Sequence, residues 1–237
     1  MRETVAENLS RVRERIAEAC VRARREPCDV TMVAVTKTAP LNAVRALIEL
    51  GVNDLGESRV GPLQERAAEL APELPTLAPG RPVRWHMIGH VQRNKIKTVL
   101  DAGVDVVHSV DSLRLAEELN ARAEKIGRRL AVMIQVNCSR EPQKFGVAVG
   151  AATALGEMVA SLRYVRLMGL MTMGPLSANP EASRPAFARL RELLDDMRRD
   201  GVGGPDLRHL SMGMSQDYPV AIEEGATILR IGSTLFE

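Results

Sequence analysis

The sequence is poor in aromatic residues and in cysteine. Only 3% of its 237 residues are Phe, Trp or Tyr, so the core must be built mainly from Val, Leu, Ile, Ala and Met. The three cysteines, Cys20, Cys28 and Cys138, form no CxxC pair, which argues against a disulfide framework or a zinc knuckle. This cysteine usage fits a reducing compartment, and we therefore expect a cytoplasmic protein.

Long apolar runs and a strong net charge are also missing. No run approaches the ~20 apolar residues that a membrane span needs, and residues 1–20 are charged throughout, unlike a signal peptide. The net charge is +2, with basic and acidic residues mixed along the chain. We therefore expect neither nucleic acid nor a membrane as a partner.

Apolar runs and helical patterns alternate along the chain. Strands are predicted at residues 30–37, 52–57, 83–89, 104–110, 130–137, 165–173, 207–212 and 226–232. Helices are predicted at residues 1–20, 41–51, 61–70, 94–103, 111–127, 151–162, 184–201 and 215–225, and the Pro-rich segment 71–82 as a loop. Continuous apolar strands are typical of a parallel sheet covered on both faces.

This order predicts one domain, residues 1–237, with the α/β fold of a (β/α)8 TIM barrel. The eight strands alternate with seven helices, so the extra N-terminal helix is expected to supply the eighth by packing beside the last strand. An open, doubly wound sheet is the alternative. No interior linker, repeat or low-complexity tract divides the chain.

In a barrel, the functional site lies at the carboxyl ends of the strands, often with a phosphate held after strands seven and eight. Strand seven ends in SMGMS and strand eight in RIGS. Glycine lets backbone N–H groups approach an anion, and Ser215 stands where the next helix is expected to begin. Glycine and serine are also ordinary turn residues, so the phosphate prediction depends on both loops occurring together.

Two cations stand near strand ends. Lys37 follows the apolar run of the first strand, where a solvated lysine would be ordinary. Opposite a phosphate site, however, its amine can form an imine with a phosphorylated aldehyde. Arg230 shares a strand face with Ile228 and Gly232. If that face is buried, its guanidinium needs hydrogen-bond acceptors, because arginine keeps its charge. The alternative is an arginine at the strand end that is solvated or paired with a surface carboxylate. A pyridoxal 5′-phosphate (PLP) site and a phosphosugar aldolase would both match this pattern.

Five segments resemble one known family. The chain is similar to the YggS/PROSC pyridoxal-phosphate homeostasis proteins, which are close in fold to the N-terminal barrel of alanine racemase, in VAVTKTAP, WHMIGHVQRNK, HSVDSLRLAEELN, GLMTMGP and LSMGMSQDYPVAIEEGATILRIGSTLFE. The last segment is nearly diagnostic by itself.

The resemblance implies a set of PLP contacts. It implies an internal aldimine at Lys37, phosphate held around Ser215, and Arg230 facing the pyridine nitrogen. Because arginine keeps its proton, the ring nitrogen would stay unprotonated and the ring would be a weaker electron sink than one paired with aspartate. The full set of implied cofactor-binding residues is Lys37, Ser58, Met212, Gly213, Ser215, Arg230, Gly232 and Ser233.

Two positions leave questions open. The family usually has Gly-Glu-Asn after strand two, whereas this chain has Ser58 in place of the asparagine. Serine is shorter, so a water would have to bridge the gap to the cofactor's phenolic oxygen. Lys144 is a second family-like lysine, expected in a loop near the barrel mouth, with a solvated surface role as the alternative. His86 and His90 lack a third ligand at metal spacing, so we expect no metal site.

The resemblance further implies a monomeric or weakly associating protein that stores, delivers or buffers PLP, passing it transiently to apo PLP-dependent enzymes, without dedicated turnover. A PLP enzyme acting on amino acids, such as a racemase, is the alternative. A racemase of this barrel type uses a tyrosine from a partner subunit and a second domain. Here Tyr164 is expected to begin strand six, and Tyr218 to lie after the phosphate loop, facing away from the ring.

Overall fold

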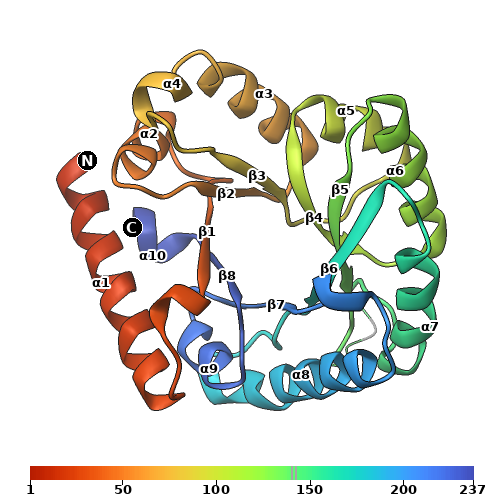
Figure 1. Cartoon of the computed structure of the whole chain (residues 1–237). Coiled ribbons are helices and arrows are strands. Elements are labelled where there is room, and N and C mark those ends of the chain that lie inside the picture. Colours follow the sequence, from red (N-terminus) through yellow and green to blue (C-terminus); the bar gives the residue numbers. More distant parts are fainter. Residues whose placement is uncertain (140, 142) are drawn as a thin grey trace.

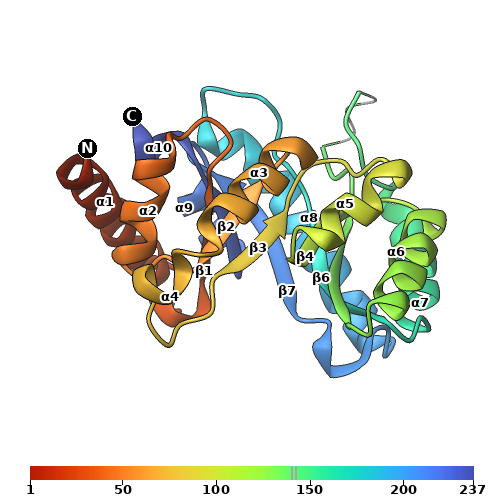
Figure 2. The same cartoon turned by 90° about the horizontal axis from the view of Figure 1, so that it is seen from above.

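The computed structural model describes residues 1–139, 141 and 143–237. Within this part of the chain, eight parallel strands form a closed barrel in sequence order, and the last strand pairs with the first. Helices surround the barrel as an outer ring (Figure 1, Figure 2). The predicted TIM barrel is confirmed, and the open sheet is wrong.

The elements follow the predicted order. The strands are β1 (Thr31–Val35), β2 (Asp54–Glu57), β3 (Arg84–Met87), β4 (Val104–Val110), β5 (Leu130–Gln135), β6 (Val165–Met171), β7 (His209–Met214) and β8 (Ile228–Ile231). The helices are α1 (Arg2–Arg22), α2 (Leu41–Glu49), α3 (Val60–Leu70), α4 (Leu74–Leu77), α5 (Ile96–Asp101), α6 (Leu113–Lys125), α7 (Val149–Ala160), α8 (Arg184–Arg199), α9 (Tyr218–Glu223) and α10 (Ser233–Phe236).

Two short helices were not predicted. α4 lies inside the Pro-rich segment that we expected to be a loop, and α10 follows β8 directly. Pro75 sits in the first turn of α4, where its fixed backbone angle suits a helix and its missing N–H has no helical partner to lose. Proline therefore begins this helix instead of breaking it.

α1 closes the outer ring. It packs against α2, α9 and α10, next to the helices that flank β8 (Figure 1). Asn8 donates hydrogen bonds from Nδ2 to the carbonyls of Leu235 and Glu237 at 3.3 and 3.0 Å. One apolar face of this helix is buried: Val5, Leu9, Val12, Ile16 and Ala19. α1 thus takes the place of the eighth helix, as predicted.

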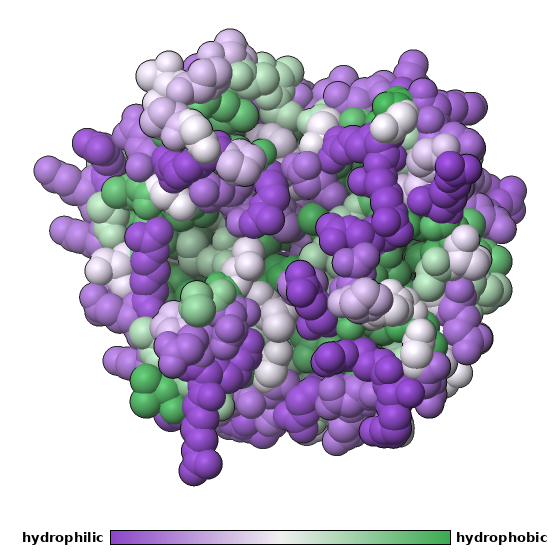
Figure 3. Space-filling view, in the orientation of Figure 1, coloured by the Kyte–Doolittle hydropathy of each residue, from purple (hydrophilic) through white to green (hydrophobic). Residues whose placement is uncertain are grey.

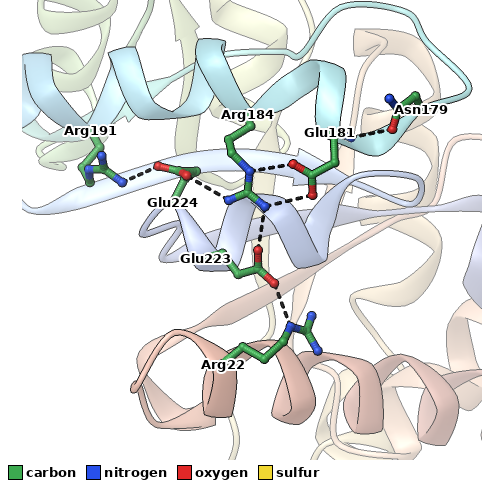
Figure 4. A network of polar contacts seen from close by, with 7 residues as sticks. All are labelled: Arg22, Asn179, Glu181, Arg184, Arg191, Glu223 and Glu224. Carbon is green, nitrogen blue, oxygen red and sulfur yellow. Dashed lines mark hydrogen bonds and ion pairs between the residues drawn. The ribbon is translucent and has the colours of Figure 1, made fainter.

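Ion pairs join α1, α8 and α9 (Figure 4). Arg184, at the start of α8, contacts Glu223, the last residue of α9, and Glu224, which follows it, at 2.7 and 2.9 Å. Glu223 also contacts Arg22 of α1 at 2.8 Å. A single exposed ion pair adds little stability, but this connected set links three helices of the ring.

Two apolar clusters fill the molecule. The larger lies between the barrel and its helices, and the smaller fills the barrel interior with Val33, Val106, Ala131, Met133, Met171 and Ile228. Aliphatic and methionine side chains therefore take the place of aromatic ones, as the composition predicts. Figure 3 shows hydrophilic side chains over most of one face, with apolar atoms visible between them.

The cysteines are unpaired in the structure. Cys20 and Cys138 are buried and Cys28 is exposed. Burial raises the pKa of Cys138 to about 11, so its thiol stays protonated at neutral pH. Among the described residues, no helix is both long enough and apolar enough to cross a membrane.

Candidate functional site

Lys37 lies in the turn that follows β1. The strand ends two residues earlier than predicted, so Lys37 is exposed and not held at the end of a buried strand. Hydrogen bonds at the residues before and after Lys37 hold this turn in place. Thr36 donates from Oγ1 to Glu57 Oε1 at 2.6 Å, and Arg66 donates to the carbonyl of Ala39 at 2.8 Å.

Glu57 contacts this turn from the neighbouring strand β2. It is fully buried at the end of β2, and its Oε1 lies 3.1 Å from Arg66 Nε. Burial raises the pKa of Glu57, and the hydrogen bond from Thr36 and the positive charge of Arg66 offset this only in part. Sequence reasoning did not assign Glu57 a role, because only the fold brings it against the Lys37 turn.

The loops after β7 and β8 meet through Ser215. Its Oγ accepts a hydrogen bond from the N–H of Gly232 at 3.2 Å, and Thr234 Oγ1 lies 3.3 Å from the same oxygen. Ser233 and Thr234 form the first turn of α10, where no carbonyl of the helix can accept from their N–H groups. Hydroxyl and N–H donors therefore gather at this point.

The same loops adjoin the strand that leads to Lys37. A Cβ placed on Gly232 would lie 3.4 Å from the Cβ of Val35, the last residue of β1. The register agrees, because β1 and β8 are paired up to Ala34 and Ile231. The predicted lysine and the predicted phosphate loops thus follow neighbouring strands at one end of the barrel.

Met212 and Gly213 lie in β7, which runs two residues further than predicted, and they shape its end in different ways. Gly213 has a φ of +91°, and a Cβ there would lie 2.6 Å from the Cβ of Ala221. Met212 packs in the cluster between barrel and helices, so only its main chain is available to the loop. Asp217 closes the loop by accepting a hydrogen bond from the N–H of Met214 at 2.7 Å.

Arg230 is buried inside the barrel and forms no ion pair with any residue that the structure describes. It is 4% exposed, and it donates from Nη1 to Ser211 Oγ at 2.7 Å and from Nη2 to the Thr172 carbonyl at 2.9 Å. A guanidinium has five N–H donors. In the part of the chain that the structure describes, the remaining donors have no acceptor, so they are available to a ligand.

Arg230 keeps its positive charge although its side chain is buried. Burial lowers the pKa of Arg230 to about 10, and the nearby carboxylate of Asp217 offsets part of this effect. The guanidinium therefore remains protonated at neutral pH and can only donate hydrogen bonds.

Ser58 and Lys144 lie on other loops at the carboxyl ends of strands. Ser58, half-buried after β2, packs its carbonyl so closely on Gly89 that a Cβ there would be 2.0 Å away. Lys144 donates to the carbonyl of Gly174 at 2.7 Å and pairs with Glu141. Lys144 therefore joins the loops after β5 and β6. Residues 140 and 142 of the same predicted loop lie outside the described residues.

The two histidines at and after β3 lie in different surroundings. His86 is buried in the barrel, whereas His90 stacks on Phe145 with ring centroids 4.4 Å apart and lies 3.5 Å from Asp111. In the described ranges, no group of three or more His, Cys, Asp or Glu side chains is arranged to hold a metal ion.

Sequence reasoning named His86 only as a metal-ligand candidate and, apart from Arg230, assigned the other polar residues inside the barrel no role. Asp54, His86, His108, Ser211 and Thr172 are all buried in or beside strands. Their only signal in the sequence is that each interrupts an apolar run. That signal does not say which face of the strand carries the residue or what it meets.

Known proteins resemble the chain over nearly its whole length. Residues 4–237 match the family model of the alanine racemase N-terminal domain. A pyridoxal phosphate homeostasis protein of Aquifex aeolicus (strain VF5) is 41% identical over 231 residues, covering 97% of this chain and 96% of the relative. This chain belongs to the YggS/PROSC family of pyridoxal phosphate homeostasis proteins. The homeostasis protein of Pseudomonas aeruginosa is 42% identical, covering 98% of this chain and 95% of the relative.

Solved structures agree with membership of the homeostasis family. PipY of Synechococcus elongatus PCC7942, solved with PLP bound, is 31% identical with a TM-score of 0.79, covering 94% of this chain and 100% of PipY. An alanine racemase of Clostridium difficile 630 is 17% identical with a TM-score of 0.69, and the match covers 98% of this chain but 55% of the racemase. The racemase therefore shares the barrel fold with this chain. The resemblance to the pyridoxal-phosphate homeostasis family, which the sequence segments indicated, is confirmed.

Proposed function

We propose that this protein binds PLP at the carboxyl ends of the barrel strands and serves in PLP homeostasis, storing, delivering or buffering the cofactor. Lys37 is the amine that holds PLP, which supplies the aldehyde for a Schiff base. An exposed lysine on a fixed turn suits this role, because the bond must form and break as PLP is taken up and released.

The observation that carries the proposal is the meeting of the loops after β7 and β8. Ser215 contacts Gly232, and the N–H groups of Ser233 and Thr234 begin α10 beside them. These groups are the kind of donors that bind a phosphate dianion through charge-assisted hydrogen bonds. Met212 and Gly213 lie just before the first loop and contribute the main chain of the end of β7. The residues present therefore fit the phosphate end of PLP.

Arg230 fits the other end of the cofactor. Its unused N–H donors match the lone pair of the pyridine nitrogen, which we assign as its ligand acceptor. A donor that keeps its proton holds that nitrogen unprotonated and weakens the ring as an electron sink. We assign Ser58 to the phenolic oxygen, which its short side chain would reach through a water.

A carrier is favoured over an amino acid racemase by where the tyrosines lie. Tyr164 precedes β6, at the opposite end of the barrel from Lys37. Tyr218 is buried and borders a cavity of about 450 Å³ formed with α1 and α10, on the outer side of the barrel wall. Neither tyrosine is placed to exchange a proton with a molecule held at Lys37, and one such group typically contributes ~10²- to 10⁴-fold in rate.

The partners we propose are PLP itself and, transiently, the apo forms of PLP-dependent enzymes that accept it. Lys144 is assigned a structural part at the mouth, since it already contacts Gly174 and Glu141. We propose a monomer in the cytoplasm, a compartment in which the three unpaired cysteines would stay reduced.

The test is an absorption spectrum of the purified protein with PLP, before and after borohydride, followed by peptide mapping of the reduced lysine. A visible imine band is expected, with the adduct on Lys37. Lys37→Ala should remove the band, whereas Lys125→Ala, on the exposed end of α6, should keep it. A band that survives in Lys37→Ala, or an adduct on Lys144 alone, would overturn the assignment.

A further inference from the structure

A line of polar side chains crosses the apolar interior of the barrel. Asp54 of β2, His86 of β3, His108 of β4, Ser211 of β7 and Arg230 of β8 are each at most 7% exposed. None of the first four was needed to explain PLP binding. A buried polar group is costly unless it is hydrogen-bonded, so the contacts among these side chains need an account.

Each member of the line contacts the next. Asp54 Oδ1 lies 2.9 Å from His86 Nε2, and His86 Nδ1 lies 2.9 Å from His108 Nε2. His108 Nδ1 lies 2.8 Å from Ser211 Oγ, which accepts from Arg230 Nη1 at 2.7 Å. The line therefore runs without a break from the amino end of β2 to the guanidinium in the candidate site.

The ionised Asp54, together with neutral imidazole rings, fixes the direction of every hydrogen bond in the line. Arg230 can only donate, and an ionised Asp54 can only accept. His86 therefore donates from Nε2 to Asp54, and in a neutral ring its Nδ1 then accepts from Nε2 of His108. The Nδ1 of a neutral His108 accepts the hydroxyl hydrogen of Ser211, which itself accepts from Arg230. This arrangement satisfies every bond with both imidazoles neutral.

The electrostatic surroundings agree with this assignment. Burial, followed by the proximity of His86 and Arg230, holds the pKa of His108 well below its usual range, so the ring is neutral. Burial alone would raise the pKa of Asp54, but hydrogen bonds from His86 and Arg84 outweigh it and keep the carboxyl ionised at neutral pH. The donor end and the acceptor end are therefore both charged.

We propose that Asp54, His86, His108 and Ser211 are positioning residues that hold the Arg230 guanidinium in place for the pyridine ring of PLP. With its hydrogen committed to His108, Ser211 presents only a lone pair to Arg230. Together with the Thr172 carbonyl, this fixes the plane of the guanidinium and directs its unused donors. The inference rests on the proposed function for its ligand, but the direction of the hydrogen bonds does not.

The first experiment uses the protein without PLP. Nitrogen-15 NMR of the histidine rings at pH 7 should show His86 and His108 neutral, each with its hydrogen on Nε2. A hydrogen on Nδ1 of either ring, or a charged imidazolium, would overturn the proposed direction. This measurement is independent of any cofactor and needs no variant to fold.

The second experiment compares three variants as PLP and unphosphorylated pyridoxal are titrated. His108→Phe breaks the line and should weaken both ligands by a similar factor of about ten, since the lost contact is to the ring. His108→Gln can accept from Ser211 and donate to His86, and should restore most of the affinity. Met133→Leu, a change of similar burial in the same interior that leaves the line intact, should bind like the wild type.

The outcomes separate the two proposals. If the wild type forms no imine with PLP, the proposed function fails, while the NMR result still decides the direction of the bonds. If the wild type binds PLP and His108→Phe binds it equally well, only the positioning role is refuted. Equal losses in His108→Phe, His108→Gln and Met133→Leu would likewise refute it, because they would reflect general loosening of the core.

Discussion

The hydroxyl of Ser215 accepts a hydrogen bond from the N–H of Gly232 at 3.2 Å, and this contact joins the loops after β7 and β8. The two residues are 17 positions apart, and each follows one of two neighbouring strands of the barrel. Their contact brings together the two halves of the phosphate site that we propose, so substitutions at Ser215 test that site directly.

Ser215→Ala should weaken PLP more than it weakens unphosphorylated pyridoxal. A lost charge-assisted hydrogen bond costs about 1.5 to 3 kcal/mol, which is at least about tenfold in affinity. The dissociation constants of both ligands can be measured by titrating the imine band. Equal losses for the two ligands would show that Ser215 does not contact the phosphate.

Gly213→Ala should destabilise the fold. The positive φ of Gly213 and the approach of a Cβ to 2.6 Å from the Ala221 Cβ both oppose a side chain. We expect a loss of roughly 1 to 3 kcal/mol in the free energy of unfolding, measured in urea. Gly150→Ala is the matched control, because nothing lies within 4 Å of a Cβ there and the residue is helical. A Gly213→Ala variant as stable as this control would contradict the prediction.

The free energy of unfolding should decrease at acidic pH, because protonation breaks the ion pairs of the Arg184 network (Figure 4). Hydrogen bonds from Arg184 and then Arg22 lower the pKa of Glu223. A carboxyl whose pKa is lower in the folded state contributes stability that is complete above its unfolded pKa, about 4.3. That contribution is lost as the pH falls through the folded pKa.

Arg184→Met should therefore flatten the loss of stability between about pH 5 and pH 3, and should cost about 1 kcal/mol or less at pH 7. Unfolding in urea across this pH range, at low and high salt, provides the measurement. Arg199→Met is the control, since among the described residues Arg199 pairs with Asp196 alone, on the exposed face of α8. An unchanged acid profile in Arg184→Met would rule out a role for this network.

Amino acids should not be turned over at the proposed PLP site. No tyrosine lies opposite Lys37, and an arginine is assigned to the ring nitrogen. L-alanine is therefore expected to replace Lys37 as the amine bound to PLP and to react no further. Racemisation and decarboxylation should not exceed those of free PLP, and the loaded protein should yield PLP to an apo enzyme. Sustained turnover that disappears in Lys37→Ala would restore the enzyme alternative.

The order of strands and helices was readable from the sequence, because apolar runs, helical spacing and turn residues are local signals. The same signals placed Ser215, Gly232 and Arg230 near the carboxyl ends of the last two strands. Closure of the barrel follows from the parallel alternation, since no edge strand is then left unpaired. The family segments added the cofactor, which composition and spacing alone left open against an aldolase.

Other features were decided only by the tertiary structure. β1 ends before Lys37 because Thr36 turns to meet Glu57. Met212 faces the helices and Arg230 the interior, a distinction that depends on the register of each strand. His108 and Ser211 are 103 residues apart, and no local pattern relates them. They contact each other because the closed barrel places β4 and β7 across a shared interior, where buried polar groups must find one another.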